Sequence, residues 1–248
     1  MSEYIIGRNP VIELLKAGQK TVNKILLSRQ AHGDPIKEIV KLAREKQIPV
    51  HNVPPEKFDS LELEDTQGVA AEVSTATYLE LEELWAQIKN LEKPMIVIMD
   101  GIEDPHNLGA IIRNAVVFGA NGIVIGKWRS AALNETVSRT SAGAVEHIPV
   151  ARVTNIAESI NKLKEWGVWV VGAEAGNKIV SEEKFMYPLA LVIGSEGSGL
   201  HKLVKERCDY LVSIPQTSTI SSLNASCAAA VILYEVYKKR QQTPPTKK

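Results

Sequence analysis

The sequence LALVIGSEGSGL, residues 189–200, joins a run of apolar residues to a glycine-rich turn. A continuous apolar run of this length is typical of a strand buried on both faces of a sheet. The turn departs from three well-known glycine motifs. Leu200 stands where a P-loop needs lysine, Lys202 where a dinucleotide fingerprint needs its third glycine, and Ile193 where a nucleophile elbow needs glycine. The role of the turn therefore depends on the segments around it.

Short apolar runs like that at 189–194 recur through the second half of the chain, and helical patterns separate most of them. The other runs are MIVIM (95–99), GIVIG (122–126), VEHIPVA (145–151), VWVVGA (168–173) and YLVSIP (210–215). This alternation predicts an α/β fold with a parallel sheet covered by helices. In such sheets ligands bind outside the carboxyl ends of the strands.

The first part of the chain has a different pattern and predicts a separate small α/β unit. RNPVIELLKAGQ and DPIKEIVKLAREKQ have helical spacing, with Asn9 and Asp34 as the expected caps. In the second of these helices, Ile36, Ile39 and Val40 are expected to face inward. KILLS, IPVHNV and GVAAEV are typical of strands.

These patterns divide the chain into four segments. We expect a first domain at 1–76, an acidic helical connection at 77–93 that ends before a proline, a second domain at 94–240, and a disordered tail at 241–248.

Composition excludes several classes of protein. The 248 residues include 44% apolar residues and two cysteines, which are too few for a disulfide framework. No run reaches the roughly 18 apolar residues of a membrane span, and the N-terminus lacks the pattern of a signal peptide, so we expect a cytoplasmic protein. Five scattered histidines give no metal-ligand spacing, and we expect no metal. The net charge is zero, but residues 1–50 carry nine Lys or Arg against five acids. That basic segment is compatible with an RNA-contacting surface or with ordinary solvated helix faces.

Three polar segments each follow a predicted strand, so their side chains should converge at one edge of the sheet. The first, DGIEDPHNLGAIIR (100–113), places Asn107 as a helix cap and Arg113 four residues after Gly109. The Arg113 guanidinium is expected to lie over the bare Gly109, toward the strand end. The alternative for Arg113 is a surface arginine paired with a carboxylate.

The other two segments are the glycine turn and PQTSTISSLNAS, residues 215–226. Glu196 either acts in a site or ties down its own turn through backbone N–H groups. Ser222 or Asn224 should cap the apolar helix that follows, and a helix N-terminus can also donate N–H groups to a ligand. Loops this rich in Gly, Ser and Thr let main-chain atoms approach a planar ligand closely, so a nucleoside-bearing cofactor fits better than a bare phosphate.

N-x-G-x-x-x-R at 107–113, GSEGSGL at 194–200 and SLNAS at 222–226 resemble, in this order, the three signature motifs of the SpoU-type ribose methyltransferases of the SPOUT class. The chain is most similar to the bacterial 23S rRNA guanosine 2′-O-methyltransferase group. The resemblance covers nearly the whole chain, with residues 1–76 similar to that group's RNA-binding domain. It implies a trefoil knot around the last strand and the SSLNAS segment.

The resemblance also implies a cofactor, S-adenosylmethionine, and a set of site residues. The cofactor would be held mostly by main-chain groups at Ala173, Gly194, Ile214 and Leu223. The functional polar positions would be Asn107, Arg113, Glu196, Ser222 and Asn224. Two departures stand out: TQG at 66–68 replaces an expected His-Gln-Gly, and PQTSTISSLN replaces the usual Pro-Met-x-Gly.

The implied reaction is methylation of a ribose 2′-hydroxyl in RNA, most closely a guanosine of 23S rRNA, by a homodimer packed through the catalytic domain. Arg113 is the family's candidate base. Because a neutral arginine is costly, we expect it to stabilise negative charge on the 2′-oxygen and to bind the adjacent phosphate. The alternatives are a methyltransferase of tRNA ribose and a non-catalytic RNA-binding or ribosome-assembly factor.

Overall fold

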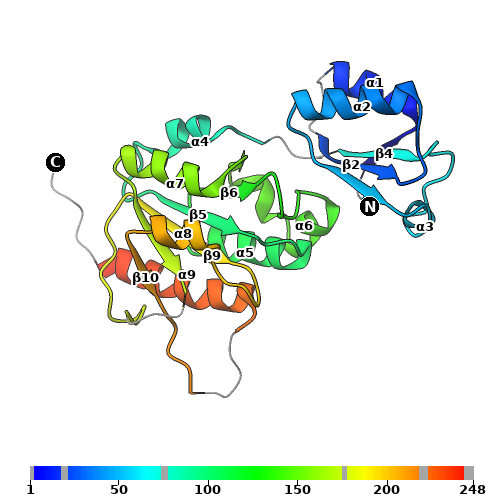
Figure 1. The fold of residues 1–248 in the computed structure, drawn as a ribbon. Coiled ribbons are helices and arrows are strands. Elements are labelled where there is room, and N and C mark those ends of the chain that lie inside the picture. The colour runs from blue at the N-terminus through cyan, green and yellow to red at the C-terminus, as the bar shows by residue number, and fades with distance from the viewer. Residues whose placement is uncertain (1–2, 18–21, 74–77, 175–177, 218–222, 243–248) are drawn as a thin grey trace. The chain divides into compact units, whose positions relative to one another are not determined.

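A computed structural model describes residues 3–17, 22–73, 78–174, 178–217 and 223–242. The chain divides into two compact units, and each has its own sheet (Figure 1). The first unit comprises Met1–Thr77 with Ala132–Glu135, and the second comprises Tyr78–Ala131 with Thr136–Lys248. Within the described ranges, no helix combines the length and the apolar character needed to cross a membrane.

The first unit is built on a four-stranded sheet in the order β1-β4-β2-β3. Strand β2 pairs in parallel with β3 and antiparallel with β4, and β1 pairs antiparallel with β4. Its elements are β1 (Glu3–Ile6), α1 (Arg8–Ala17), β2 (Val22–Ser28), α2 (Asp34–Glu45), β3 (Val50–Val53), α3 (Glu56–Asp59) and β4 (Val69–Val73). Helices α1 and α2 bury their apolar residues in one cluster with β2 and β4. A smaller cluster forms around Phe58 of α3, with Leu26 and Ala70.

Three details of the first unit differ from the sequence prediction. Val40 is 40% exposed rather than inward-facing, because Ile36, Ile39 and Ala43 already fill the narrow apolar stripe of α2. The residue that caps α2 is Gly33, while the Asp34 carboxylate accepts a hydrogen bond from Lys37 Nζ at 2.9 Å. Helix α1 begins at Arg8, so Asn9 lies within its first turn. The short β1 and α3 were not predicted.

The second unit contains the predicted parallel sheet, in the order β10-β8-β9-β5-β6-β7. Every neighbouring pair in it is parallel, which confirms the α/β class. The strands are β5 (Met95–Asp100), β6 (Gly122–Gly126), β7 (Val150–Val153), β8 (Trp169–Ala173), β9 (Leu189–Gly194) and β10 (Tyr210–Val212). The helices are α4 (Leu81–Ile88), α5 (Pro105–Val117), α6 (Glu135–Thr140), the 3₁₀ turn η1 (Ala144–His147), α7 (Ile156–Glu165), α8 (Lys202–Arg207) and α9 (Ala225–Gln242).

Helices cover both faces of this sheet (Figure 1). Helices α4, α7 and α8 bury their apolar residues in one cluster with the strands, and α5 and α9 pack against each other on the other side. Trp85 of α4 stacks on Trp166, at the end of α7, with ring centroids 6.0 Å apart. The segment 77–93, which we expected as a connection, therefore contributes a core helix to the second unit.

Two further element boundaries differ from the prediction. The VEH of VEHIPVA belongs to η1, and β7 starts at Val150, directly after Pro149, which has no N–H to donate to a ladder. Helix α9 continues through Gln242, two residues beyond the expected end of the domain. The rest of the expected tail, 243–248, lies outside the described residues.

Candidate active site

The carboxyl ends of four neighbouring strands bring the predicted site segments to one edge of the second sheet. Asp100, the last residue of β5, pairs with Gly194, the last residue of β9. Ala173, the last residue of β8, pairs with Ile193 on one side and Val212 on the other. The three polar segments leave the sheet from this edge, as the sequence predicts.

The glycine turn after β9 is a tight loop that folds back on its own strand. Ser195 and Gly199 exchange two backbone hydrogen bonds of 3.1 Å, and the hydroxyls of Ser195 and Ser198 lie 2.6 Å apart. A side chain at Gly194 would overlap the backbone of Gly199. Glycine at 194 is therefore required for the close return of the chain, and the strand end presents main-chain atoms instead of a side chain.

The Glu196 carboxylate connects this turn to two other segments. Its Oε1 atom accepts hydrogen bonds from Asn107 Nδ2 at 3.2 Å, from Ala225 N at 3.2 Å, and from Asn224 Nδ2. Asn224 Nδ2 also donates to Asn107 Oδ1 at 3.0 Å. Glu196 thus reaches α5 and α9, and these bonds go beyond the role of tying down its own turn. We call Asn107, Glu196 and Asn224 the carboxamide cluster.

Asn224 also caps α9, which confirms the prediction that Ser222 or Asn224 does so. Its Oδ1 accepts from Ser226 N at 2.9 Å, from Ser226 Oγ at 2.6 Å and from Cys227 N at 3.3 Å. One amide side chain therefore satisfies helix N–H groups with its oxygen and joins the cluster with its nitrogen. Ser222 lies outside the described residues.

The prediction that Asn107 caps α5 is wrong. Asp104 is the cap, and its carboxylate accepts from His106 N at 2.9 Å. This leaves the Asn107 side chain, in the first turn, free to reach across to Glu196 and Asn224. Two turns further along the same face, Asn114 Nδ2 donates to Ser226 O at 3.3 Å. Asn107 and Asn114 therefore define the edge of α5 that faces the start of α9.

Arg113 stays outside this network. The space over Gly109 is filled by α6, because a side chain at Gly109 would overlap Thr140 Oγ1. This space is not open to Arg113, contrary to the prediction. Arg113 is exposed, and within the described part of the chain it makes no hydrogen bond or ion pair. The surface ion pair considered as an alternative for Arg113 is therefore not formed with any of those residues.

The four positions expected to meet a cofactor through the main chain lie around the same edge. Ala173 and Gly194 end adjacent strands, and Ile214 follows β10 by two residues. Leu223 precedes Asn224 and is 41% exposed. Ala173 has a small side chain, and the backbone of Gly199 occupies the space where a side chain at Gly194 would lie.

Two carboxylates at this edge were not predicted. Asp100 is 4% exposed, and its two oxygens contact His201, one the backbone N at 2.7 Å and the other the ring Nδ1 at 2.9 Å. Glu174 Oε2 accepts from Leu200 N at 3.0 Å. Both carboxylates tie the end of the glycine turn to a neighbouring strand. An acid directly after a buried strand, as in MIVIMD, is the signal that could have found Asp100.

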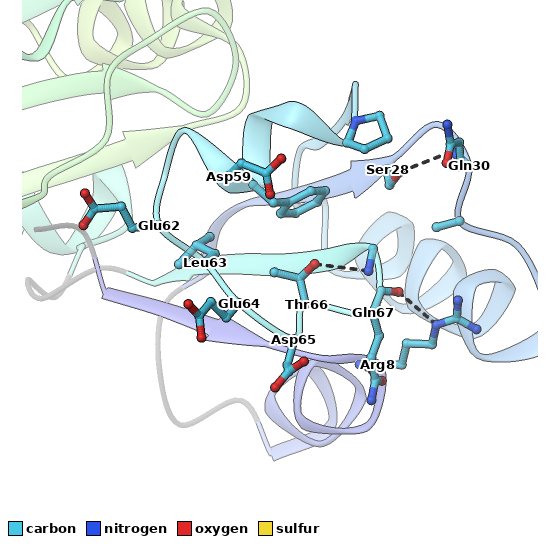
Figure 2. Close-up of a pocket in the computed structure, with 14 residues that line it drawn as sticks. Arg8, Ser28, Gln30, Asp59, Glu62, Leu63, Glu64, Asp65, Thr66 and Gln67 are labelled. Atoms are coloured by element: carbon cyan, nitrogen blue, oxygen red, sulfur yellow. Dashed lines mark hydrogen bonds between the residues drawn. The ribbon is translucent and has the colours of Figure 1, made fainter.

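The first unit contains a cavity of about 940 Å³ around the TQG sequence. Figure 2 shows its wall running from the end of α3 to the start of β4. The acidic residues that line it are Asp59, Glu62, Glu64 and Asp65. Arg8 is the one cationic residue among the described residues of that lining, so the cavity has acidic character and disfavours phosphate groups.

Thr66 and Gln67 have structural roles at this cavity. Thr66 is buried, and its Oγ1 accepts a hydrogen bond from Gly68 N at 3.3 Å. Gln67 accepts from Arg8 through both its backbone and its side-chain oxygen, at 3.1 Å each (Figure 2). The threonine that replaces the expected histidine thus supports the turn into β4. Over the described ranges, no group of three or more His, Cys, Asp or Glu residues could hold a metal ion.

Both units match family models. Residues 94–234 match the SpoU rRNA Methylase family, and residues 4–79 match the RNA 2′-O ribose methyltransferase substrate binding family. Among curated proteins, the chain is 45% identical over 245 residues to YacO of Bacillus subtilis, named as a TrmH family tRNA/rRNA methyltransferase, with 96% of each chain covered. A protein of the same name from Staphylococcus saprophyticus is 46% identical over 238 residues, with 95% of each chain covered.

Solved structures give the same relationship. The SpoU methyltransferase AviRb from Streptomyces viridochromogenes, in complex with the cofactor AdoMet, is 27% identical, with a TM-score of 0.61 over 97% of this chain and 91% of that one. A TrmH/SpoU tRNA modifying enzyme of A. aeolicus is 26% identical, with a TM-score of 0.55 over 65% of this chain and 85% of that one.

The cluster geometry predicts that Glu196 and Asn224 are energetically coupled. Glu196→Ala should lower the free energy of unfolding of the second unit by about 1 kcal/mol, because three donors lose their acceptor. Asn224→Ala should also lower the free energy of unfolding. Its effect should be smaller, by about 0.5 kcal/mol or more, in a protein that already carries Glu196→Ala. Urea unfolding followed by tryptophan fluorescence measures this, since all tryptophans lie in the second unit. Glu206→Ala, an exposed glutamate of α8, is the control. Additive losses from the two cluster variants would contradict the coupling.

Proposed function

The chain belongs to the SpoU family of RNA methyltransferases, and from this premise we propose that it methylates the 2′-hydroxyl of a guanosine ribose in 23S rRNA. The observation that carries the proposal is the carboxamide cluster, which joins all three motif segments beside the glycine turn. A non-catalytic assembly factor would have no need to keep the three motifs joined in this way. The proposal includes a cytoplasmic location, where ribosomal RNA is assembled in bacteria.

The residues at the sheet edge fit S-adenosylmethionine, the methyl donor of the family. Ala173 and Gly194 lie at the ends of adjacent strands, and the glycine turn closes over Gly194, where a side chain would not fit. We assign Ala173, Gly194, Ile214 and Leu223 to holding the cofactor through backbone groups. When bound, the cofactor supplies an electrophilic methyl group on a sulfonium. The main-chain edge is suited to fixing its position so that the hydroxyl can approach in line.

We assign Arg113 to the RNA rather than to the fold. An exposed guanidinium without a protein partner among the described residues is available to bind the phosphate next to the target ribose. Its fixed positive charge also stabilises the negative charge that develops on the 2′-oxygen as its proton leaves. Because arginine stays protonated, it acts in this scheme as an electrostatic stabiliser and not as a base.

The cluster residues position the reacting groups. Glu196 holds Asn107 and the first turn of α9 against the glycine turn. The amino terminus of α9 is therefore kept at a constant distance from the strand ends assigned to the cofactor. Asn107 and Asn224 lie at the surface of this cluster, where their amides can also orient the ribose. Ser222 belongs to the same motif, and we assign it an orienting role beside Asn224.

The choice of rRNA over tRNA rests on the first unit. That unit matches a substrate-binding family model in its own right. The A. aeolicus enzyme, whose name specifies tRNA, covers only 65% of this chain, which leaves about a third of it unmatched. A large additional unit is suited to selecting one site within a long, folded RNA. The B. subtilis relative is named for both tRNA and rRNA, so the target needs a direct test.

Mapping of 2′-O-methyl groups in rRNA and tRNA, from cells with and without the protein, tests the target. We expect one guanosine of 23S rRNA to lose its methyl group when the protein is absent and to regain it on complementation. A site lost from tRNA instead would assign a tRNA substrate. No change in either RNA, from a protein that still binds RNA, would favour an assembly factor.

We also propose a trefoil knot in the second unit, around β10 and the SSLNAS segment. Support comes from the start of α9, which is hydrogen-bonded both to the turn after β9 and to α5. An experimental structure of the second unit in which no segment of the chain passes through a loop formed by another segment would contradict the knot.

Arg113→Ala should lower methyl transfer by about 100-fold or more, the scale expected for loss of one electrostatic donor. Cofactor affinity and melting temperature should stay near wild type, because the Arg113 side chain makes no hydrogen bond or ion pair with the residues that the structure describes. Arg113→Lys should rescue poorly, since a point charge cannot reproduce the planar fork. The measurement is single-turnover transfer of labelled methyl to rRNA fragments at saturating cofactor.

Arg207→Ala serves as the matched control, because Arg207 lies at the far end of α8, away from the carboxyl edge of the sheet. It should transfer methyl groups at the wild-type rate. A lower melting temperature for Arg113→Ala, with near-normal transfer by the folded protein, would show that Arg113 is structural.

The proposed enzyme is a homodimer packed through α5 and α9. Val117, Val231, Tyr234 and Tyr237 are exposed by 66%, 41%, 49% and 38%, and the rings of both tyrosines contact Phe118 at the end of α5. Light scattering should give a mass near twice 27.2 kDa. Val231→Glu should shift it toward the monomer, because a charge would be buried in the interface, whereas Val40→Glu in α2 should not. A wild-type monomer at micromolar concentration would refute the dimer.

A further inference from the structure

A second cavity, of about 230 Å³, opens at the carboxyl edge of the sheet in the second unit. None of the motif residues that the structure describes lines it. Its walls come from the ends of β5 and β6, the loop that follows β6, the first turn of α7 and the start of α8. The residues that matter for its chemistry are Trp128, Arg129, His201 and Leu203.

Trp128 offers an aromatic surface that the fold does not bury. It is 47% exposed, and Leu203 on the same cavity is 59% exposed. The loop that carries Trp128 turns back sharply on β6, because a Cβ at Gly126 would lie 3.1 Å from Trp128 O. Arg129, the next residue, has a left-handed φ of 50°. An exposed tryptophan on the wall of a mostly apolar cavity is a suitable platform for a flat, unpaired nucleobase.

Arg129 is the cation that the described lining of this cavity holds, and the Asp100 carboxylate in the same lining is engaged by His201 through its backbone N and its Nδ1. Lys127 and Lys202 are adjacent in sequence to lining residues and add two further cations nearby. Within the described part of the chain, none of these three cations has a hydrogen bond or ion pair through its side chain. The amino terminus of α7 adds its partial positive charge. Phosphates are thus favoured here, in contrast to the acidic cavity of the first unit.

His201 links this cavity to the glycine turn. Its Nδ1 atom contacts Asp100, which orients the ring and leaves Nε2 available for another partner. A Cβ placed on Gly101 would lie 3.0 Å from His201 Cε1 and 3.5 Å from Ser195 Cβ, so the ring lies beside the turn that holds Glu196. The cavity therefore continues the proposed active site along the same sheet edge.

We propose that this cavity binds an unpaired nucleobase of the RNA substrate, stacked on Trp128, with Arg129 contacting the phosphate and His201 the base edge. The inference rests on the proposed function and adds to it the residues that position RNA next to the target ribose. Trp128 acts by positioning, since nothing places it at the reacting atoms.

The test compares Trp128→Ala with Trp169→Ala, a second exposed tryptophan, which starts β8 and so lies at the opposite end of that strand from Ala173. The probe is a fluorescein-labelled, single-stranded RNA oligonucleotide of mixed sequence, and affinity is measured by fluorescence anisotropy on the full chain. Trp128→Ala should weaken binding about tenfold or more, the scale of losing one stacked base. Trp128→Phe should recover part of the loss, and Trp169→Ala should bind like wild type.

Melting temperature and cofactor affinity are measured beside RNA affinity and should not change. If Trp128→Ala does not fold, the RNA affinities of Arg129→Ala and Trp128→Phe test the inference instead. Both variants must bind RNA more weakly than the wild type. Equal RNA affinity of folded Trp128→Ala and Trp169→Ala would overturn the inference. Methyl transfer by the wild type is scored separately, so an RNA-binding protein that transfers no methyl group would refute the proposed function and leave the cavity assignment standing.

Discussion

The hydrogen bonds received by one oxygen of Glu196 hold three distant parts of the chain in one place. Asn107 brings the start of α5, Asn224 and Ala225 bring the start of α9, and Glu196 itself belongs to the glycine turn after β9. The arrangement requires glycine at 194, because only a bare α-carbon lets the turn fold back on its strand. The site therefore depends on the position of the Glu196 carboxylate at the edge of the sheet.

The glycine turn that carries Glu196 divides the sheet edge into two regions with different proposed roles. On one side of the turn, the ends of β8, β9 and β10 present main-chain atoms suited to a nucleoside cofactor. On the other side lies a cavity that is lined by Asp100, His201, Arg129 and the exposed Trp128. In the proposal, Arg113 supplies the charge near the reacting oxygen while the cluster holds the surrounding segments, so catalysis and positioning fall on different residues.

Much of this arrangement could be predicted from sequence, because it follows from local patterns. Strands buried on both faces read as continuous apolar runs, and a parallel sheet brings the segments after them to one edge. Features that depend on long-range packing could not be predicted. Thr140 fills the space over Gly109, and Val40 is exposed because its neighbours complete the core. The cap of α5 is different, because Asp104 followed by Pro105 is a local helix-start signal that could have been preferred to Asn107.

In the proposed reaction, this sheet edge transfers a methyl group to a ribose oxygen of RNA. To measure it, the protein is incubated with S-adenosylmethionine labelled in its methyl group and with bacterial RNA, the RNA is digested to nucleosides, and the label is located by mass spectrometry. We expect label on the ribose of one nucleoside, guanosine. Label on a nucleobase, or no label from protein that binds both cofactor and RNA, would contradict the proposed reaction.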